Sequence, residues 1–248
     1  MPSLMNKKTV LITGASRGIG RACAHIFAKK GFSLVVTCQS SEKKLLELTS
    51  EIIDEYGVEC LPSVGDIGDS DYVNTLFAEI QLKFGHLDIL INNAGISHIG
   101  LLQEMELDEW SQLMNTNVTS TFLCSKAAIP MMLSQGAGSI VNISSVWGNV
   151  GASCEVAYSA SKGALNSFTK ALGKELAPSN IRVNAIALGA IDTEMNKFLS
   201  VDEKLALESE IPLGRMGTAT EAADLIADIA INHPCLTAQV ITMDGGWS

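Results

Sequence analysis

A tyrosine and a lysine stand four residues apart in the segment YSASK, as Tyr158 and Lys162. On a helix, residues at this spacing lie one turn apart on the same face. A phenol with its ordinary pKa of about 10 is a poor acid–base catalyst near neutral pH, but a nearby ammonium stabilises the phenolate and lowers that pKa. The pair predicts proton transfer, in which Tyr158 gives a proton to a carbonyl oxygen while a hydride arrives at the carbon.

A glycine-rich turn follows the first apolar segment of the chain, with the spacing G-x-x-x-G-x-G. Glycines allow a tight turn and let the backbone approach a pyrophosphate, which the amides and positive dipole end of the following helix can bind. Such a turn can also need glycine for backbone conformation alone. Its position between a strand and a helix favours cofactor binding. The residues predicted to hold the cofactor there are Gly14, Ser16, Arg17, Gly18, Ile19 and Gly20.

Two further polar residues fit the same chemistry. Ser145 ends an apolar segment 13 residues before Tyr158, and its hydroxyl could stabilise the charge that develops on the carbonyl oxygen. Asn117 lies in the helical stretch NTNVTS. Taken singly, Ser145 could be a strand-end cap, Asn117 could satisfy backbone groups, and the Tyr–Lys pair could be solvated on a surface. Jointly, and following a nucleotide-binding turn, the four residues indicate a catalytic set.

Short β-branched segments alternate with longer helical patterns along the 248 residues. This alternation predicts right-handed βαβ connections and a parallel sheet covered on both faces. We therefore expect one α/β domain over residues 1–248, a Rossmann-type doubly wound parallel β-sheet of about seven strands with helices on both faces. The strand candidates are 9–13, 34–38, 59–64, 89–92, 139–143, 182–186 and 240–243, and the helix candidates are 18–30, 42–56, 70–84, 108–133, 158–176 and 219–232.

Residues 189–212, between the sixth and last strand candidates, contain no clear strand. They carry one short helical pattern, at 201–210. Long insertions of this kind often close over a substrate, so this region is predicted to be a substrate lid.

Four motifs together resemble those of the short-chain dehydrogenase/reductase family: the glycine turn, NNAG at residues 92–95, Ser145 and YxxxK. The resemblance covers essentially the whole chain. It implies that Lys162 also holds the cofactor ribose and that Asn117 anchors a water linking Lys162 to solvent. Leu188 stands where the family usually has proline, which restores a backbone N–H. The remaining cofactor contacts that it implies are Asp66 and Ile67 at the adenine, Asn93, Ala94 and Gly95 in NNAG, Tyr158, and Gly189, Ile191 and Thr193 near the nicotinamide.

The resemblance also implies a homo-oligomer, most often a tetramer. The helical segments 108–133 and 158–176 carry more apolar residues than one core face needs, which would place part of them in subunit interfaces. The alternative is that all of them face the sheet. The residues in question include Leu123, Ala127, Met131, Leu165 and Phe168.

The end of the second strand candidate, residues 37–41, has no carboxylate. Enzymes of this fold that prefer NAD place an acidic residue there to hold the ribose 2′-OH. Arg17 is expected beside a 2′-phosphate, and Gln39 could add a neutral hydrogen bond. We therefore expect NADP(H) as the preferred cofactor, with NAD(H) as the alternative.

Two substrate classes follow from closer resemblances. Overall the chain resembles 3-oxoacyl-acyl-carrier-protein reductases, whose acidic carriers need basic docking residues just before the fifth strand and at the end of the YxxxK helix. Residues 135–137 and 178–180 contain no Lys or Arg, and the net charge is −10. Electrostatics therefore disfavours an acidic carrier, mainly through the association rate.

The segment 144–194 more closely resembles bacterial elongation factor P 5-aminopentanone reductases, as do Ser97-His98 and the ending GGW. This implies a ketone substrate, either a small molecule or a group attached to a protein. Glu155 could pair with the terminal amine of such a group, Trp147 could form a pocket wall, and Ser97 could contact the substrate. The alternatives are a solvated loop charge for Glu155 and a lid contact for Trp147. A more remote alternative is a non-catalytic nucleotide-binding protein.

Composition excludes several classes. The net charge of −10 opposes binding to nucleic acid or an anionic membrane surface. No apolar run reaches 18 residues and the first eight residues lack the apolar core of a signal peptide, so we expect a cytoplasmic protein with no membrane segment. The six cysteines are scattered without a CxxC pair or a partnering histidine, which predicts reduced core thiols and no metal site.

Overall fold

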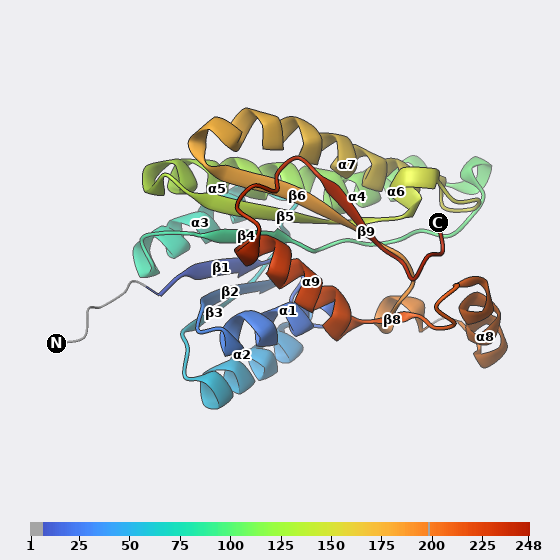
Figure 1. Ribbon diagram of the computed structural model, residues 1–248, viewed down its shortest axis with the longest axis horizontal. Helices are drawn as coiled ribbons and strands as arrows, with labels where there is room; N and C mark the ends of the chain where they lie inside the picture. The colour runs from blue at the N-terminus through green and yellow to red at the C-terminus, as the bar shows by residue number, and fades with distance from the viewer. Residues whose placement is uncertain (1–6, 198) are drawn as a thin grey trace.

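Seven parallel strands form the centre of the structure, a computed structural model that describes residues 7–197 and 199–248. The strand order is β3-β2-β1-β4-β5-β6-β9, and Figure 1 shows the sheet between two layers of helices. This confirms the predicted Rossmann-type α/β fold. The strands are β1 (Thr9–Ile12), β2 (Ser33–Cys38), β3 (Cys60–Val64), β4 (Ile89–Asn92), β5 (Gly138–Ser145), β6 (Ile181–Leu188) and β9 (Val240–Met243).

The central strands are apolar because both of their faces are covered. In β1, Val10 and Ile12 pack into one core cluster and Leu11 packs into the other. In β2, Val36 and Val35 divide between the two clusters in the same way. Successive side chains of a strand point to opposite faces, so a strand buried on both faces reads as a continuous apolar run.

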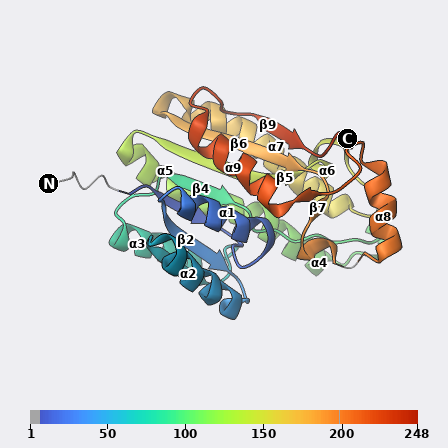
Figure 2. The ribbon, with the colours of Figure 1, turned by 60° about the horizontal axis from the view of Figure 1, so that its bottom comes forward.

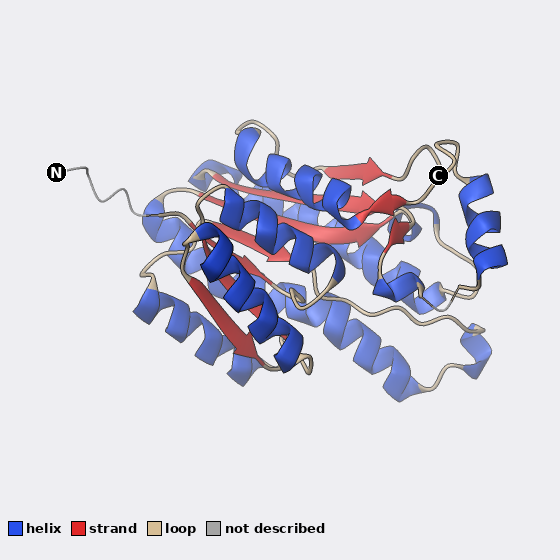
Figure 3. Ribbon diagram, turned by 90° about the horizontal axis from the view of Figure 1, so that it is seen from below, coloured by secondary structure: helices blue, strands red, loops and turns tan. Residues whose placement is uncertain are grey.

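Three helices cover each face of the sheet. The helices α1 (Gly18–Lys29), α2 (Glu42–Tyr56) and α9 (Ala219–Asn232) pack on one face, as Figures 2 and 3 show, and α3 (Ser70–Lys83), α5 (Ser120–Gln135) and α7 (Val156–Leu176) pack on the other. The other helical elements lie nearer the edges and loops. They are α4 (Leu107–Met114), α6 (Trp147–Val150), α8 (Val201–Glu210), the π-helical turn η2 (Asn115–Thr119) and the 3₁₀ turns η1 (Leu102–Glu104), η3 (Ala177–Ser179) and η4 (Glu194–Asn196).

Two local features differ from the sequence-based expectation. The helix predicted at 108–133 is interrupted, because α4 and α5 are joined through the π-helical turn Asn115–Thr119. The region 189–212 contains a two-residue strand, β7 (Ile191–Asp192), which pairs with β8 (Gly217–Thr218). A five-residue turn and a two-residue strand each span too few residues for a hydrophobic pattern to repeat, so periodicity cannot reveal them.

The apolar residues proposed for subunit contacts mostly face the core. Leu165 is buried, and Leu123, Ala127 and Met131 pack against the core cluster on the α5 side. Leu165 therefore has no apolar surface left for a subunit contact, whereas Leu123, Ala127 and Met131 are only partly buried and their place in an interface stays a prediction. Apolar side chains that are exposed on α5 are instead Phe122 and Leu133, at 46% and 48%.

The described part of the chain contains no helix that is both long and apolar enough to cross a membrane. Within residues 7–197 and 199–248, no three His, Cys, Asp or Glu side chains gather as a metal site would require. All six cysteines are free thiols, and four of them are buried. Residues 1–6, inspected above for a signal peptide, and Phe198 of the predicted lid lie outside the described residues.

Candidate active site

The sheet reverses its winding between β1 and β4, since β2 and β3 lie on one side of β1 and β4 to β6 on the other. Open α/β sheets bind ligands outside the carboxyl ends of the strands at such a point. A cleft of about 830 Å³ lies there, lined by residues that follow β1, β2, β4, β5 and β6. Among the predicted cofactor residues, it is lined by Gly14, Ser16, Arg17, Gly18, Ile19, Gln39, Asp66, Ile67, Asn93, Ala94, Gly95, Gly189, Ile191 and Thr193, and it is also lined by Ser97, Ser145, Trp147, Glu155, Tyr158 and Lys162.

The glycine turn needs its glycines for conformation and for close approach. Gly14 and Gly18 have φ of 64° and 54°, in the left-handed region that side chains disfavour. A Cβ on Gly14 would lie 2.9 Å from the Cα of Ala94. Gly20 does not line the cleft, but a Cβ there would lie 2.6 Å from the Nδ2 of Asn93. The turn and the NNAG segment are therefore in close contact, and Gly14, Gly18, Ala94 and Gly95 of the two segments line the cleft.

Asn93 joins these two segments. Its Nδ2 donates to the carbonyls of Thr13 and Gly14, at 2.9 and 3.1 Å. In return, the hydroxyl of Thr13 accepts from the backbone amides of Asn93 and Ala94, at 3.0 and 3.1 Å. Asn93 thus positions the cofactor-side floor of the cleft through its side chain.

Ser145, Tyr158 and Lys162 meet where the end of β5 faces the first turns of α7. The Tyr158 hydroxyl is hydrogen-bonded with the Ser145 side chain. The Nζ of Lys162 is buried and lies 5.5 Å from the centroid of the Tyr158 ring. The three side chains that sequence reasoning grouped together are therefore brought together by the fold.

The prediction that Lys162 lowers the pKa of Tyr158 is wrong for the chain without a bound cofactor. Burial raises the pKa of Tyr158 to about 12, opposed by the Ser145 hydrogen bond and assisted by the charge of Glu155. Lys162 is not among the groups that lower this pKa, and its Nζ donates to the carbonyl of Ile143 at 2.8 Å. Burial also lowers the pKa of Lys162, to about 8. A phenol with a raised pKa keeps its proton at neutral pH but is a weaker acid, since an acid catalyst works best with a pKa near the working pH.

Asn117 lies in the π-helical turn and is buried. Its Oδ1 accepts from the amide of Ile96 at 2.8 Å, and its Nδ2 donates to the Ile96 carbonyl at 2.9 Å and to the Ser161 hydroxyl at 3.0 Å. Single π-helical turns often mark functional sites. Here the turn sets an amide that clamps the chain just after Gly95 to the helix carrying Tyr158 and Lys162.

A second set of buried amides, not predicted from the sequence, braces the same strands and helices. The Ser144 hydroxyl donates to Asn166 at 2.6 Å, and Asn166 donates to Asn149 at 2.9 Å. Asn142 accepts from Asn92 at 2.9 Å and donates to Thr169 at 2.8 Å. Satisfied polar networks in a low-dielectric interior hold a unique geometry, so these bonds position α7 against β5.

Two tryptophans and one carboxylate, Trp147, Trp247 and Glu155, line the same cleft as Ser145 and Tyr158. Trp147 and Trp247 have ring centroids 4.8 Å apart, tilted by 58°. Glu155 is half-buried, and its pKa is raised by burial although a hydrogen bond with Trp147 opposes the shift. Trp247 was not among the predicted site residues, and its place depends on Asp244, which accepts from the amides of Gly246 and Ser248 at 2.9 and 2.8 Å.

The predicted lid contributes apolar side chains to the cleft. Met195, Leu199 and Leu207 line it, the last from α8. Leu188, which stands in place of the family proline, is buried at the end of β6 and lies in register with Ser145. Gly189 then donates its amide to the carbonyl of Met243 at 3.0 Å, so sheet pairing holds the bend without proline.

One carboxylate does lie beside Arg17, although no acidic residue ends β2. The Nη1 of Arg17 is 3.3 Å from Glu194, and the Nζ of Lys44 is 3.0 Å from the same carboxylate. Glu194 lines the cleft from the segment that leads into the lid, far from Arg17 in sequence. The absence of a carboxylate at the end of β2 holds, but a carboxylate from a distant part of the chain pairs with Arg17.

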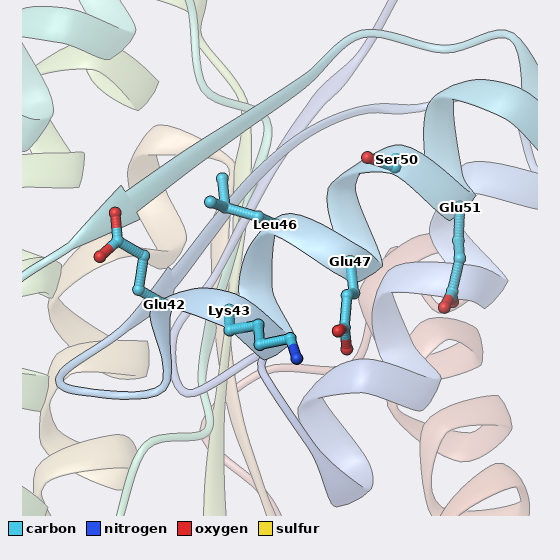
Figure 4. Close-up of a pocket in the computed structure, with 6 residues that line it drawn as sticks. All are labelled: Glu42, Lys43, Leu46, Glu47, Ser50 and Glu51. Atoms are coloured by element: carbon cyan, nitrogen blue, oxygen red, sulfur yellow. The ribbon is translucent and has the colours of Figure 1, made fainter.

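A second concavity lies on the outer face of α2, away from the residues described above (Figure 4). It is lined by Glu42, Lys43, Leu46, Glu47, Ser50 and Glu51. All six belong to one helix, so the concavity is a groove along its surface and is separate from the cleft.

Comparisons with known proteins agree with this arrangement. The family model described as short chain dehydrogenase matches residues 8–204. An uncharacterized oxidoreductase of Bacillus subtilis, YmfI, is 36% identical over 241 residues, which cover 97% of this chain and 98% of that protein. The 3-oxoacyl-[acyl-carrier-protein] reductase FabG of Staphylococcus aureus is 38% identical over 240 residues, which cover 96% of this chain and 97% of that protein.

A solved structure is also similar throughout. The crystal structure of YwfH, an NADPH-dependent reductase involved in bacilysin biosynthesis, superposes with a TM-score of 0.92 and 27% sequence identity and covers 98% of both chains. The family match spans the glycine turn, NNAG, Ser145 and the YxxxK motif. The chain therefore belongs to the short-chain dehydrogenase family and is an oxidoreductase acting on CH–OH and C=O groups.

Proposed function

We propose that this protein is an NADP(H)-dependent reductase that converts a ketone into a secondary alcohol. The observation that carries the proposal is the meeting of Ser145, Tyr158 and Lys162 at one end of a cleft whose other end is the glycine turn. Tyr158 donates the proton, Ser145 donates a hydrogen bond to the ketone oxygen, and Lys162 and Asn117 position Tyr158 and the cofactor ribose. The nicotinamide, when bound, supplies the hydride.

The residues present fit a dinucleotide. Gly14, Gly18 and Ile19 line the cleft at the start of α1, where the backbone amides of a glycine turn can bind a pyrophosphate. Arg17 supplies positive charge at the cleft wall, and Lys44 adds a second cation from the first turn of α2, just beyond the residues that follow β2. Charge of this kind favours the 2′-phosphate of NADP(H), and the similarity to an NADPH-dependent reductase supports the same preference.

The proposed substrate is a ketone that carries a positively charged amine, such as the 5-aminopentanone group on elongation factor P. Glu155, Trp147 and Trp247 support it, because a half-buried carboxylate beside two indole rings suits an ammonium group. Residues 189–212 form the proposed lid, with Leu199 and Leu207 over the chain of the substrate.

The alternative substrate is a 3-oxoacyl group on an acyl carrier protein. The 38% identity to 3-oxoacyl-[acyl-carrier-protein] reductase favours it. The segments 135–137 and 178–180, which hold no basic residue, speak against docking of an acidic carrier. Side-by-side assays with a 3-oxoacyl thioester and with a lysine derivative bearing 5-aminopentanone would decide, since efficient turnover of the thioester alone would contradict the amine-bearing substrate.

Glu155→Gln is expected to raise KM for the amino-ketone while leaving a neutral ketone of the same length almost unaffected. The change removes the charge that faces the ammonium and keeps the shape of the side chain. A charge pair contributes about 0.2–1 kcal/mol when exposed and more when desolvated, so kcat/KM should fall by a small factor to about tenfold. Steady-state kinetics with both ketones measure this.

Glu210→Gln is the matched control, because Glu210 carries the same charge, is exposed at the end of α8 and does not line the cleft. It should leave both substrates unchanged. Equal losses for the charged and the neutral ketone in Glu155→Gln would show that Glu155 shapes the loop before Tyr158 and does not recognise an amine.

A homo-oligomer, with a tetramer as the proposed state, also belongs to this proposal. Phe122 and Leu133, exposed on α5, are the apolar side chains that a partner would cover. Light scattering at micromolar concentration should give a mass that is a multiple of 26.3 kDa. A mass near that of one chain would contradict it.

A cytoplasmic location is proposed as well, and the six free thiols support it.

A further inference from the structure

Three cations surround the carboxylate of Glu194. The Nζ of Lys44 lies 3.0 and 3.2 Å from its two oxygens, the Nη1 of Arg17 lies 3.3 Å away, and the Nζ of Lys197 lies 3.7 Å away. Lys197 belongs to the same short segment as Glu194. Arg17 and Lys44 do not, since they come from the glycine turn and from the first turn of α2. Glu194 therefore ties the beginning of the lid to two separate parts of the cofactor side.

The position of this cluster connects it with the cofactor ribose. Arg17 and Glu194 line the cleft, together with Gln39 and the two serines that follow it between β2 and α2. Lys44 lies on the first turn of α2, directly beyond those serines. Both cations thus border the wall at which this fold recognises the 2′ position of the ribose.

A phosphate monoester is a stronger ligand for this cation pair than the carboxylate is. It carries a charge of about −1.5 to −2 and three acceptor oxygens, whereas Glu194 carries one negative charge. Hydrogen bonds from Lys44, the largest cause, and the nearby charges of Lys197 and Arg17 lower the pKa of Glu194, so the carboxylate is ionised at neutral pH. An ionised carboxylate beside the same cations would repel an arriving phosphate.

We propose that Glu194 is an internal anion, paired with Arg17 and Lys44, which the 2′-phosphate of NADP(H) displaces from these two cations. NAD(H), which has no 2′-phosphate, leaves Glu194 paired. After displacement Glu194 keeps Lys197 as its partner, within the lid segment itself. Glu194, a residue of the proposed lid, therefore changes its pairing according to which cofactor is bound. This inference rests on the proposed preference for NADP(H).

The test measures dissociation constants of NADPH and NADH by equilibrium fluorescence titration for the full chain and three variants. Glu194→Gln removes the competitor and should tighten NADPH about two- to fivefold, the range expected for an exposed charge pair, without changing NADH. Lys44→Gln should weaken NADPH by a similar or larger factor, again without changing NADH. Lys43→Gln makes the same change one residue away, on the outer groove of α2, and should change neither (Figure 4).

The outcomes separate this inference from the cofactor proposal. A wild-type chain that binds NADPH no more tightly than NADH would contradict the NADP(H) preference itself. A wild-type preference for NADPH that Glu194→Gln leaves unchanged or weakens would overturn the role of Glu194 alone. Equal changes for both cofactors in Glu194→Gln would mean that the residue only braces the lid. An effect of Lys43→Gln as large as that of Lys44→Gln would show a general charge effect in place of a phosphate site.

Discussion

Tyr158→Phe is expected to reduce kcat by about 10²–10⁴-fold while NADPH binds almost as it does to the wild type. The change removes one hydroxyl and keeps the ring that packs beside Lys162. The hydroxyl is the proposed proton donor, and its raised pKa of about 12 keeps it protonated across the neutral range. Ser145 would still contact the ketone oxygen, but the Tyr158 hydroxyl that supplies the proton would be missing.

Single-turnover kinetics and NADPH titration would measure this prediction. Tyr56→Phe is the matched control, because it removes the same hydroxyl from α2, where the oxygen lies 3.4 Å from the Nδ1 of His25 and away from the cleft. It should keep normal turnover. If Tyr158→Phe retained more than about a tenth of the wild-type kcat, Tyr158 could not be the acid.

The strand and helix order could be predicted because burial leaves a periodic trace in the sequence. β4, α2, α8, α9 and β9 have the bounds that the apolar patterns indicated. Each of these elements contributes enough apolar residues to complete at least one period. The motifs of the cleft could be predicted for another reason: each is a short run of sequence next to a strand end, where parallel strands bring their carboxyl ends together.

The rest of the site depends on contacts between residues far apart in the chain. Glu194 meets Arg17 across 177 residues, and Trp247 meets Trp147 across 100 residues. No local pattern marks either contact, since an isolated Glu or a terminal Trp reads as an exposed side chain. The pKa of Tyr158 was mispredicted for a related reason. Spacing places Lys162 near the ring, but it does not show that burial has the largest effect on the pKa of Tyr158.

Arg17→Ala is expected to weaken NADPH by about tenfold or more and to leave NADH within about a factor of two. Hydrogen bonds to charged groups contribute about 1.5–3 kcal/mol. NADH has no 2′-phosphate, so its binding does not depend on these bonds. Arg17 also pairs with Glu194, so the variant frees part of the carboxylate to repel the phosphate, which enlarges the difference between the cofactors. Arg21→Ala is the control, since Arg21 lies one turn further along α1 and pairs with Glu51 outside the cleft. Titration of both cofactors measures the result, and a loss of the same size for NADH and NADPH would show that Arg17 shapes the glycine turn without recognising the phosphate.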